Sequence, residues 1–231
     1  MLLEEAQWVG TKLNSIFQTG QVILNLGSST LKSRTELQPH MAKFIFEPLN
    51  GNAIKVIHSD IVEDEGVDIQ GDFTDPNFIK QLKQNNFDGV MCCNLLEHLE
   101  DRKPLIDCLN QITPLGGVLL LTVPKQYPYH LDPIDTMYRP TPEELATLFT
   151  AFDVLFAEVV TARRQILRNG KLVCHRNYFE QLKEDPKLFL RLIFRSMLPF
   201  YKFNSWKITV NDLFKMFRPF SATCVVLKRT S

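Results

Sequence analysis

The chain lacks the two glycine-rich signatures that most often mark nucleotide binding. Neither GxGxxG nor GxxxxGK followed by Ser or Thr occurs in its 231 residues. The first pattern lets a dinucleotide pyrophosphate approach a turn, and the second cradles the phosphates of a nucleoside triphosphate. Interpretations based on NAD or ATP therefore lose their main support.

Paired cysteines with metal-binding spacing are also absent. The five cysteines are odd in number and contain no CxxC pair. Cys92 and Cys93 are neighbours, so on a strand their side chains point to opposite faces and cannot easily grip one metal together. We expect free thiols in a reducing compartment, and no metal-ligand set is apparent.

Neither sign of charge is in excess. Lys plus Arg and Asp plus Glu both total 26, whereas nucleic-acid binders usually present a large basic surface. No uninterrupted apolar run reaches the roughly 18 residues of a membrane span, and MLLEEAQ carries acids where a signal peptide carries basic residues. We expect a cytoplasmic protein with no nucleic-acid partner.

Short apolar runs alternating with helical segments are what the chain does contain. Strands are expected at 21–29, 42–49, 53–61, 67–73, 87–93, 118–124, 153–160 and 222–229. Helices are expected at 2–17, 75–84, 102–112 and 141–149, whereas 30–40 shows no clean helical stripe. The alternation predicts an α/β fold with a Rossmann-like parallel sheet covered by helices on both faces.

Small and acidic residues follow several of these strands. Ligands of open α/β sheets bind beyond the carboxyl ends of the strands. The turn Gly27-Ser28-Ser29 lets a ligand approach the backbone, although a glycine after a strand is often only a turn. Asp60 and Asp72 can accept hydrogen bonds from ribose hydroxyls or an adenine amino group, or can simply cap loops. Glu47 is a rival for the ribose, since it lies 20 residues beyond Gly27.

Several motifs, taken in order, resemble class I S-adenosylmethionine-dependent methyltransferases of the type 11 kind. They are LNLGSS, VIHSDI, VDIQGDFTD, FDGVMCCNLLEHLED, ITPLGGVLLLTVP and YPYHLDPIDTMYRPTPEELATLF. The resemblance implies one methyltransferase domain over 1–231 with a seven-stranded sheet. Its last strand, ATCVVLKR, would be antiparallel and would follow a helical insertion at about 176–217.

The same resemblance implies an S-adenosyl-L-methionine site. Its expected residues are Asn25, Gly27, Ser28, Ser29, Asp60, Asp72, Phe73, Asn94, Leu95, Leu96 and Glu97. His98, next in the LEH motif, is either catalytic or a structural hydrogen-bonding residue. Asn25 stands where the family usually has an acid, and only one glycine follows. A non-catalytic cofactor-binding or scaffold protein with this fold is therefore the alternative.

The segment PYHLDPIDTMYRP carries the best catalytic candidates. His130 has an ordinary pKa near 6.5, which suits proton abstraction from an acceptor hydroxyl at neutral pH. Asp135 or Asp132 could orient it, while Tyr138 or Arg139 could position a substrate. The alternative is a proline-braced loop whose Asp-Arg pair merely closes the site.

Two late segments bear on the acceptor. Residues 161–176 gather five basic side chains, which form either a solvated hairpin edge or a site for an anionic substrate. Residues 184–203 begin as a helix capped by Asp185, which could cover the sheet, form a dimer contact or lie on a membrane surface. We expect methyl transfer to a small-molecule or glycan-like acceptor, with the oligomeric state left open.

Overall fold

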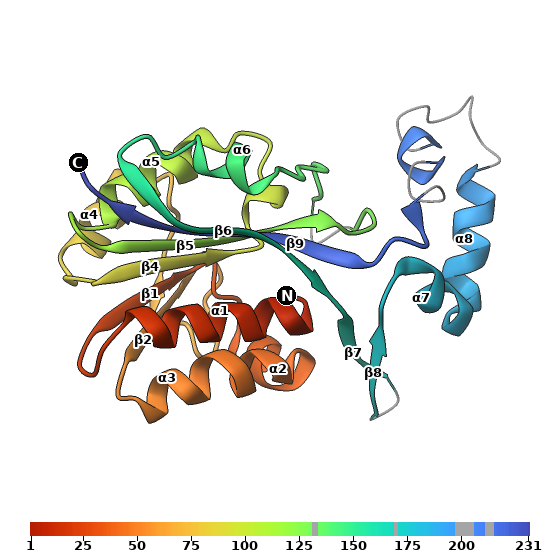
Figure 1. Ribbon diagram of the computed structural model, residues 1–231, viewed down its shortest axis with the longest axis horizontal. Coiled ribbons are helices and arrows are strands. Elements are labelled where there is room, and N and C mark those ends of the chain that lie inside the picture. Colours follow the sequence, from red (N-terminus) through yellow and green to blue (C-terminus); the bar gives the residue numbers. More distant parts are fainter. Residues whose placement is uncertain (131–133, 169–170, 197–205, 211–214) are drawn as a thin grey trace.

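The computed structural model describes residues 1–130, 134–168, 171–196, 206–210 and 215–231. Its centre is a seven-stranded sheet in the order β3-β2-β1-β4-β5-β9-β6 (Figure 1). The strands in that order are β3 (Ile69–Gln70), β2 (Lys55–Asp60), β1 (Val22–Leu26), β4 (Gly89–Cys93), β5 (Val118–Gln126), β9 (Phe220–Arg229) and β6 (Phe152–Ala162). Seven of the eight strands expected from the sequence are present.

The five neighbouring strands β3, β2, β1, β4 and β5 pair in parallel, and β9 is antiparallel to both β5 and β6. The central strands are buried along almost their whole length, because helices cover both faces of the sheet. Continuous apolar sequence, rather than alternation, is what such strands require. The expected seven-stranded Rossmann-like sheet with an antiparallel last strand is therefore confirmed.

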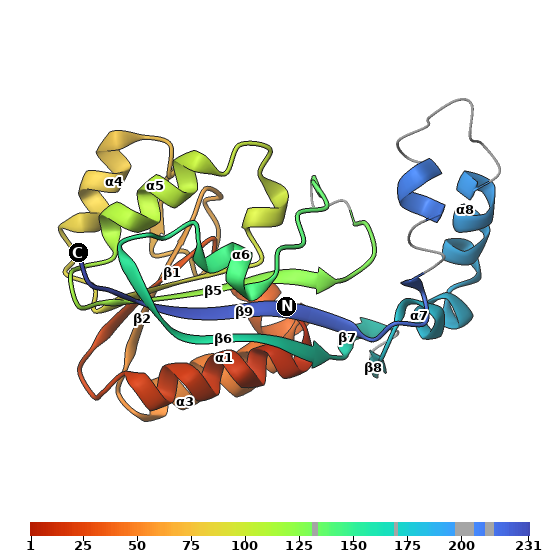
Figure 2. The ribbon, with the colours of Figure 1, turned by 45° about the horizontal axis from the view of Figure 1, so that its top comes forward.

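Helices on the two faces enclose separate cores (Figures 1 and 2). One face carries α4 (Pro76–Lys83), α5 (Lys103–Ile112) and α6 (Pro142–Ala146), whose apolar side chains form one cluster. The other carries α1 (Leu3–Ile16), α2 (Pro39–Met41) and α3 (Glu47–Gly51). Expected caps are present, since Asp75 accepts a hydrogen bond from the Asn77 amide and Thr141 forms a capping box with Glu144.

Residues 42–49 are helical, so the strand expected there is wrong. A π-helical segment (Ala42–Phe46) continues directly into α3, and its fully buried Ile45 and Leu49 are four residues apart. Both side chains join the core against α1. A β-carbon on Gly10 of α1 would lie 1.8 Å from the Phe44 carbonyl oxygen, so the absent side chain lets the two helices touch. Packing against α1 thus accompanies a helix where the short apolar run suggests a strand.

The polar stretch before it is also more helical than expected. Residues Ser33–Leu37 form another π-helical turn, followed by α2. Its buried side chain is that of Arg34, which donates hydrogen bonds to three backbone carbonyl oxygens, those of Ser28, Ser29 and Gly66. A charged residue thus organises this turn, which is why no apolar stripe signals it.

Beyond β6 the chain leaves the sheet. Strands β7 (Arg164–Arg168) and β8 (Lys171–His175) form a separate two-stranded hairpin. They lead to α7 (Tyr178–Glu184) and α8 (Pro186–Ser196), which stand away from the sheet in both views (Figures 1 and 2). Asp185 caps α8 as expected, accepting hydrogen bonds from the amides of Lys187 and Leu188. Residues 197–203 of the expected helix lie outside the described part.

Helix α8 presents an apolar surface. Leu190 and Phe194 are 64% and 67% exposed, whereas Leu192 is buried. Within the described ranges, however, no helix combines the length and the hydropathy that crossing a bilayer requires.

Candidate functional site

A cavity of about 450 Å³ opens at the carboxyl ends of β1 and β4. Clefts of this size suit small ligands, and this end of a parallel sheet is where such ligands bind. Its wall includes expected site residues from both strand ends, namely Asn25, Gly27, Ser28, Ser29, Asn94, Glu97 and His98, together with His130 from the later loop. The structure therefore brings together eight residues that sequence reasoning placed at one site.

The turn after β1 is held in a left-handed conformation. Gly27 has a φ of +73° and Ser29 a φ of +57°, and the amides of Gly27 and Ser28 both donate to the Ser59 carbonyl of β2. A β-carbon on Gly27 would lie 3.0 Å from the Leu95 side chain. Glycine thus allows the β1 and β4 turns to approach each other at the cavity wall.

Arg34 holds this turn through hydrogen bonds, and the sequence patterns did not predict this role. Its guanidinium binds the carbonyls of Ser28, Ser29 and Gly66 and also lines the cavity. Burial lowers the pKa of Arg34, and the nearby charges of Asp68 and Asp60 oppose that shift. Nothing in the local sequence pattern distinguishes this arginine from a solvated one.

Five expected cofactor residues lie outside the cavity wall, and three of them lie at or beyond the ends of β2 and β3. Asp60 accepts hydrogen bonds from the backbone amides of Ser29 at 2.7 Å and Val62 at 3.3 Å. Asp72 caps a turn by accepting from the Thr74 amide, and Phe73 packs against the core cluster. The structure therefore places Asp60 as a support of the β1 turn.

Glu47, the alternative residue for the ribose, also lies outside the cavity wall. Glu47 is exposed on α3, because the segment that carries it is helical. It is not among the residues that line the cavity.

Asn25 is buried at the end of β1, and its side-chain nitrogen lies 3.1 Å from Nδ1 of His58 on β2. Burial, reinforced by the positive charge of Arg34, lowers the pKa of His58 to about 4. The amide that replaces the usual acid is thus engaged with a neutral imidazole.

Asn94 begins the turn after β4 with a φ of +53°. Its side chain donates a 2.8 Å hydrogen bond to Oε1 of Glu5, a buried residue of α1 that sequence reasoning missed. Leu95 lies below Gly27, and Leu96 is buried in the core cluster, so neither of these two lines the cavity.

Glu97 is the most unusual residue of the site. It is 1% exposed, and within the described part of the chain neither of its carboxylate oxygens has a hydrogen-bond partner. Burial raises the pKa of Glu97 to about 7. His98 Nε2 lies 3.7 Å from Glu97 Oε1, and the other ring nitrogen of His98 contacts the Ile134 carbonyl. A buried carboxyl poised near neutrality is typical of functional sites.

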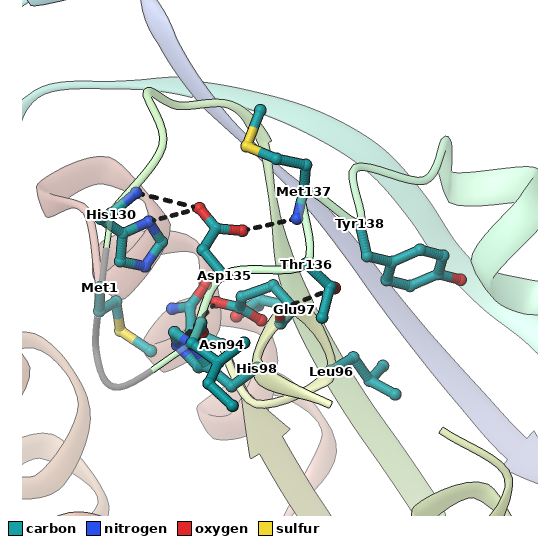
Figure 3. A network of polar contacts seen from close by, with 12 residues as sticks. Met1, Asn94, Leu96, Glu97, His98, His130, Asp135, Thr136, Met137 and Tyr138 are labelled. Carbon is teal, nitrogen blue, oxygen red and sulfur yellow. Dashed lines mark hydrogen bonds and ion pairs between the residues drawn. The ribbon is translucent and has the colours of Figure 1, made fainter. Parts of the chain in front are cut away.

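The loop that follows β5 closes over Glu97 (Figure 3). His130 Nδ1 forms a 3.0 Å ion pair with Oδ2 of Asp135. That oxygen accepts hydrogen bonds from the His130 amide at 3.1 Å and from Arg139 at 2.7 Å, and Oδ1 accepts one from the Met137 amide. Burial alone would raise the pKa of Asp135, but hydrogen bonds from His130 and Arg139 outweigh it and hold the pKa well below its usual range. Asp135 is therefore ionised at neutral pH and holds His130 through this contact.

The remaining loop candidates take other positions. Arg139 is bound to Asp135, and Tyr138 lies under the Arg102 guanidinium at 4.0 Å, pointing away from His130 (Figure 3). Asp132 lies outside the described residues. The loop is fastened to the β4 turn because the Thr136 amide and hydroxyl both donate to the Glu97 carbonyl.

Part of the wall comes from segments that sequence reasoning did not place there. These residues are Met1, Leu2, Glu5, Ser33, Arg34, Leu37, Gln38, Met41, Tyr127, Arg164 and Gln165. Among them, Arg164 belongs to the basic segment 161–176, for which the sequence allows either a site for an anionic substrate or a solvated hairpin edge. Arg163, next to it, instead pairs with Glu4.

No protein-family model matches the chain, and no curated protein matches it in sequence. Solved structures do match. One match is a Galdieria sulphuraria protein described as a presumed sarcosine dimethylglycine methyltransferase. It is 12% identical, with a TM-score of 0.53 over 99% of this chain and 86% of that chain. Coclaurine N-methyltransferase bound to N-methylheliamine and S-adenosylhomocysteine is 15% identical, with a TM-score of 0.52 over 98% and 70%.

The cyclase SpnF is also similar, with 14% identity and a TM-score of 0.55 over 98% of this chain and 81% of that chain. Identities this low speak for the fold and leave the reaction open. The strand order, the antiparallel β9 and these neighbours agree with one another: the chain has the fold of the class I S-adenosylmethionine-dependent methyltransferases.

Proposed function

We propose that the protein transfers a methyl group from S-adenosyl-L-methionine to a small-molecule or glycan-like acceptor. The observation that carries the proposal is the cavity at the ends of β1 and β4. It joins a small-residue turn, at Gly27-Ser28, to a buried unpaired carboxylate, Glu97, and to an oriented imidazole, His130.

The residues of the β1 turn fit the methionine half of the cofactor. The turn has no β-carbon at Gly27 and carries only small side chains at the next two positions, so a ligand can approach its backbone. The bound cofactor supplies a methyl carbon already activated by a sulfonium. The protein's own task is then chiefly alignment of the acceptor, which is worth up to about 7–11 kcal/mol in well-oriented systems.

We infer an indirect role for Asp60 in cofactor binding. Its carboxylate fixes the Ser29 amide, and Arg34 fixes the carbonyls of Ser28 and Ser29 from the other side. The β1 turn is thereby held in shape before any ligand arrives, which reduces the cost of binding.

We assign to His130 the role of general base toward the methyl acceptor. Asp135 occupies its Nδ1, so Nε2 remains for a proton from an acceptor hydroxyl. Arg164, which also lines the cavity and lies over the Tyr127 ring, supplies a positive charge that suits a phosphorylated or otherwise anionic acceptor.

A second candidate function is cofactor binding without methyl transfer. Its support is the depleted first motif, in which Asn25 carries no charge and is engaged with His58, together with the similarity of the fold to a cyclase. Such a protein would bind the cofactor and leave its methyl group in place.

Calorimetry followed by a transfer assay tests both. S-adenosylhomocysteine is titrated into the purified protein beside NAD and ATP, and methyl-labelled cofactor is then incubated with phosphorylated sugars and unphosphorylated counterparts. Binding of the homocysteine form alone, followed by labelled product, is the expected result. Binding without product favours the second candidate. Absence of binding at about 1 mM, far above the usual micromolar range of substrate affinity, removes both.

A further inference from the structure

Three potential metal ligands face one another at the cavity wall. One ligand atom each from Glu97, His98 and His130 lies within 4.8 Å of one from each of the other two. All three residues line the cavity, two from the turn after β4 and one from the loop after β5 (Figure 3). His130 lies more than 30 positions after Glu97 and His98 in the sequence, which is why spacing alone did not reveal the group.

The imidazoles are already oriented as metal-bound histidines usually are. In metal sites, the ring nitrogen that does not bind the ion is normally tied to a carboxylate or to a backbone carbonyl. Here Nδ1 of His130 lies 3.0 Å from Asp135, and Nδ1 of His98 contacts the Ile134 carbonyl. Both Nε2 atoms are therefore the ones left for a ligand.

The carboxylate of Glu97 lacks the partners that a buried anion needs. It is 1% exposed, and neither oxygen accepts a hydrogen bond from any described residue. An isolated buried charge is strongly unfavourable unless it is paired or coordinates a metal. Arg139, whose positive charge acts on Glu97, has its guanidinium on Asp135 instead. A cation between Glu97 and the two imidazoles removes this deficiency.

Distances agree with such a cation. Bonds of about 2.0–2.1 Å to nitrogen and oxygen in a tetrahedral site put neighbouring ligand atoms roughly 3.4 Å apart. The 3.7 Å between His98 Nε2 and Glu97 Oε1 is close to that value. The wider separations are at most 4.8 Å, and a shift of about 1.4 Å in His130, which is carried by a loop, brings them to that value.

We propose that Glu97, His98 and His130 bind a divalent transition-metal ion, with at least one coordination position open to the cavity. Two imidazoles favour zinc, cobalt, nickel or iron over magnesium and calcium, which prefer oxygen ligands. Three protein ligands with an open position are the arrangement of catalytic rather than structural zinc sites.

The role of the ion rests on the proposed methyl transfer. A hydroxyl of the acceptor that binds the open position becomes more acidic and is fixed in place. His130 Nε2 cannot bind the ion and accept a proton at once. In the metal-bound protein, therefore, activation of the acceptor passes from His130 to the ion, and Asp135 becomes the residue that orients a ligand.

Metal binding is measured directly on untagged, chelator-treated protein. Cobalt(II) is titrated while its visible absorption is recorded, and zinc is titrated by calorimetry. The expected result is one equivalent per chain with an absorption typical of low-coordinate cobalt. Glu97→Gln, His98→Gln and His130→Gln should each weaken binding by at least about tenfold, and Asp135→Asn by about 10–100-fold.

His175→Gln is the matched control, because His175 is also buried beside an acid, with Nε2 3.1 Å from Glu184, but does not line the cavity. Circular dichroism checks that each variant is folded. No binding of either ion at about 1 mM, or binding that His175→Gln abolishes and the site variants leave intact, overturns the proposal.

The same samples are titrated with S-adenosylhomocysteine, so that the two proposals fail separately. If S-adenosylhomocysteine binds and neither metal ion does, the metal proposal is rejected and the proposed methyltransferase function stands. If a metal ion binds and S-adenosylhomocysteine does not, the proposed function is rejected and the metal site stands.

Discussion

Asn94 and Glu5 are 89 residues apart in sequence, and their side chains are joined by a 2.8 Å hydrogen bond. The same Glu5 oxygen accepts a 2.6 Å hydrogen bond from the Thr122 hydroxyl, and its other oxygen accepts from the Leu2 amide. One buried carboxylate thus ties α1 to the turn after β4 and to the middle of β5. The left-handed turn at Asn94, and with it the cavity floor, depends on this residue.

Replacing Glu5 by alanine should destabilise the protein by about 2–4 kcal/mol, because three donors lose their acceptor in a buried place. Urea unfolding followed by circular dichroism measures the loss. Glu4→Ala is the control, since Glu4 pairs with the half-exposed Arg163 and such surface pairs contribute only about 0–1 kcal/mol. Equal effects of the two substitutions would show that the buried network adds nothing.

Gly27→Ala should weaken the binding of S-adenosylhomocysteine by about tenfold or more, because the new methyl group meets the Leu95 side chain at 3.0 Å and displaces the β1 turn, which lines the cavity. Gly116→Ala carries the same conformational strain, with a φ of +76° against +73°, but its methyl group meets nothing within 4 Å. Calorimetry on both variants separates the effect of the cavity from that of backbone strain. A similar loss in both would contradict the placement of the cofactor.

Loss of the His130 imidazole should affect turnover rather than cofactor affinity. In His130→Gln we expect kcat for a hydroxyl acceptor to fall by roughly 10²–10⁴-fold, while the dissociation constant for S-adenosylhomocysteine stays unchanged. Initial rates and calorimetry give the two quantities, and His175→Gln serves again as the buried histidine outside the cavity. An unaltered kcat would remove His130 from the reaction.

Stability should fall on mild acidification because of His58. Its pKa is about 4 in the folded protein and near 6.5 when unfolded, so between these values the unfolded chain binds the proton more tightly. The contribution of neutral His58 to the free energy of unfolding is therefore fully present above pH 6.5 and is lost as the pH falls towards 4. The charged neighbours are Arg34, which lowers the pKa, and Asp68, which raises it.

His58→Gln tests this directly. Urea midpoints at pH 7 and pH 5 should differ less in the variant than in the unmodified protein, since glutamine keeps a polar partner for Asn25 without titrating. Parallel curves for the two proteins would place the acid sensitivity elsewhere.

The apolar surface of α8 gives a fifth prediction. If the helix lies on a membrane surface, Leu190→Glu combined with Phe194→Glu should reduce co-sedimentation with anionic vesicles by several-fold, because these side chains are 64% and 67% exposed. Leu115→Glu is the control, being a 72% exposed leucine in another part of the chain. Sedimentation that is absent in the unmodified protein, or equal in all three, argues against membrane contact.

Sequence patterns predicted most of the sheet because its strands are short, apolar and bounded by turn residues. The run at 118–124 is buried throughout as β5, and the segment at 87–93 ends in the cavity wall as expected. The strand expected at 42–49 was wrong because a short apolar run is compatible with either a buried strand or a buried helix segment. Contact with Gly10 of α1, invisible to any local pattern, settled the outcome.

The site was predictable only where it belongs to strand ends. Gly27 and Glu97 follow from the topology, since parallel strands place their carboxyl ends together. Arg34 and Glu5 could not be found this way, because each acts through backbone or side-chain partners far along the chain. The grouping of Glu97 with His130 likewise depends on how the later loop folds back, which the Thr136 hydrogen bonds to Glu97 fix.

Strand β9 lies between β5 and β6, although it comes from residues 220–229. During synthesis, β5 and β6 emerge first and have no sheet partner on their facing edges until residues 220–229 have left the ribosome. Unpaired edges of this kind promote association between nascent chains. We therefore expect production of the protein to respond more strongly to chaperones and to early termination within β9 than to changes anywhere in the α7–α8 region.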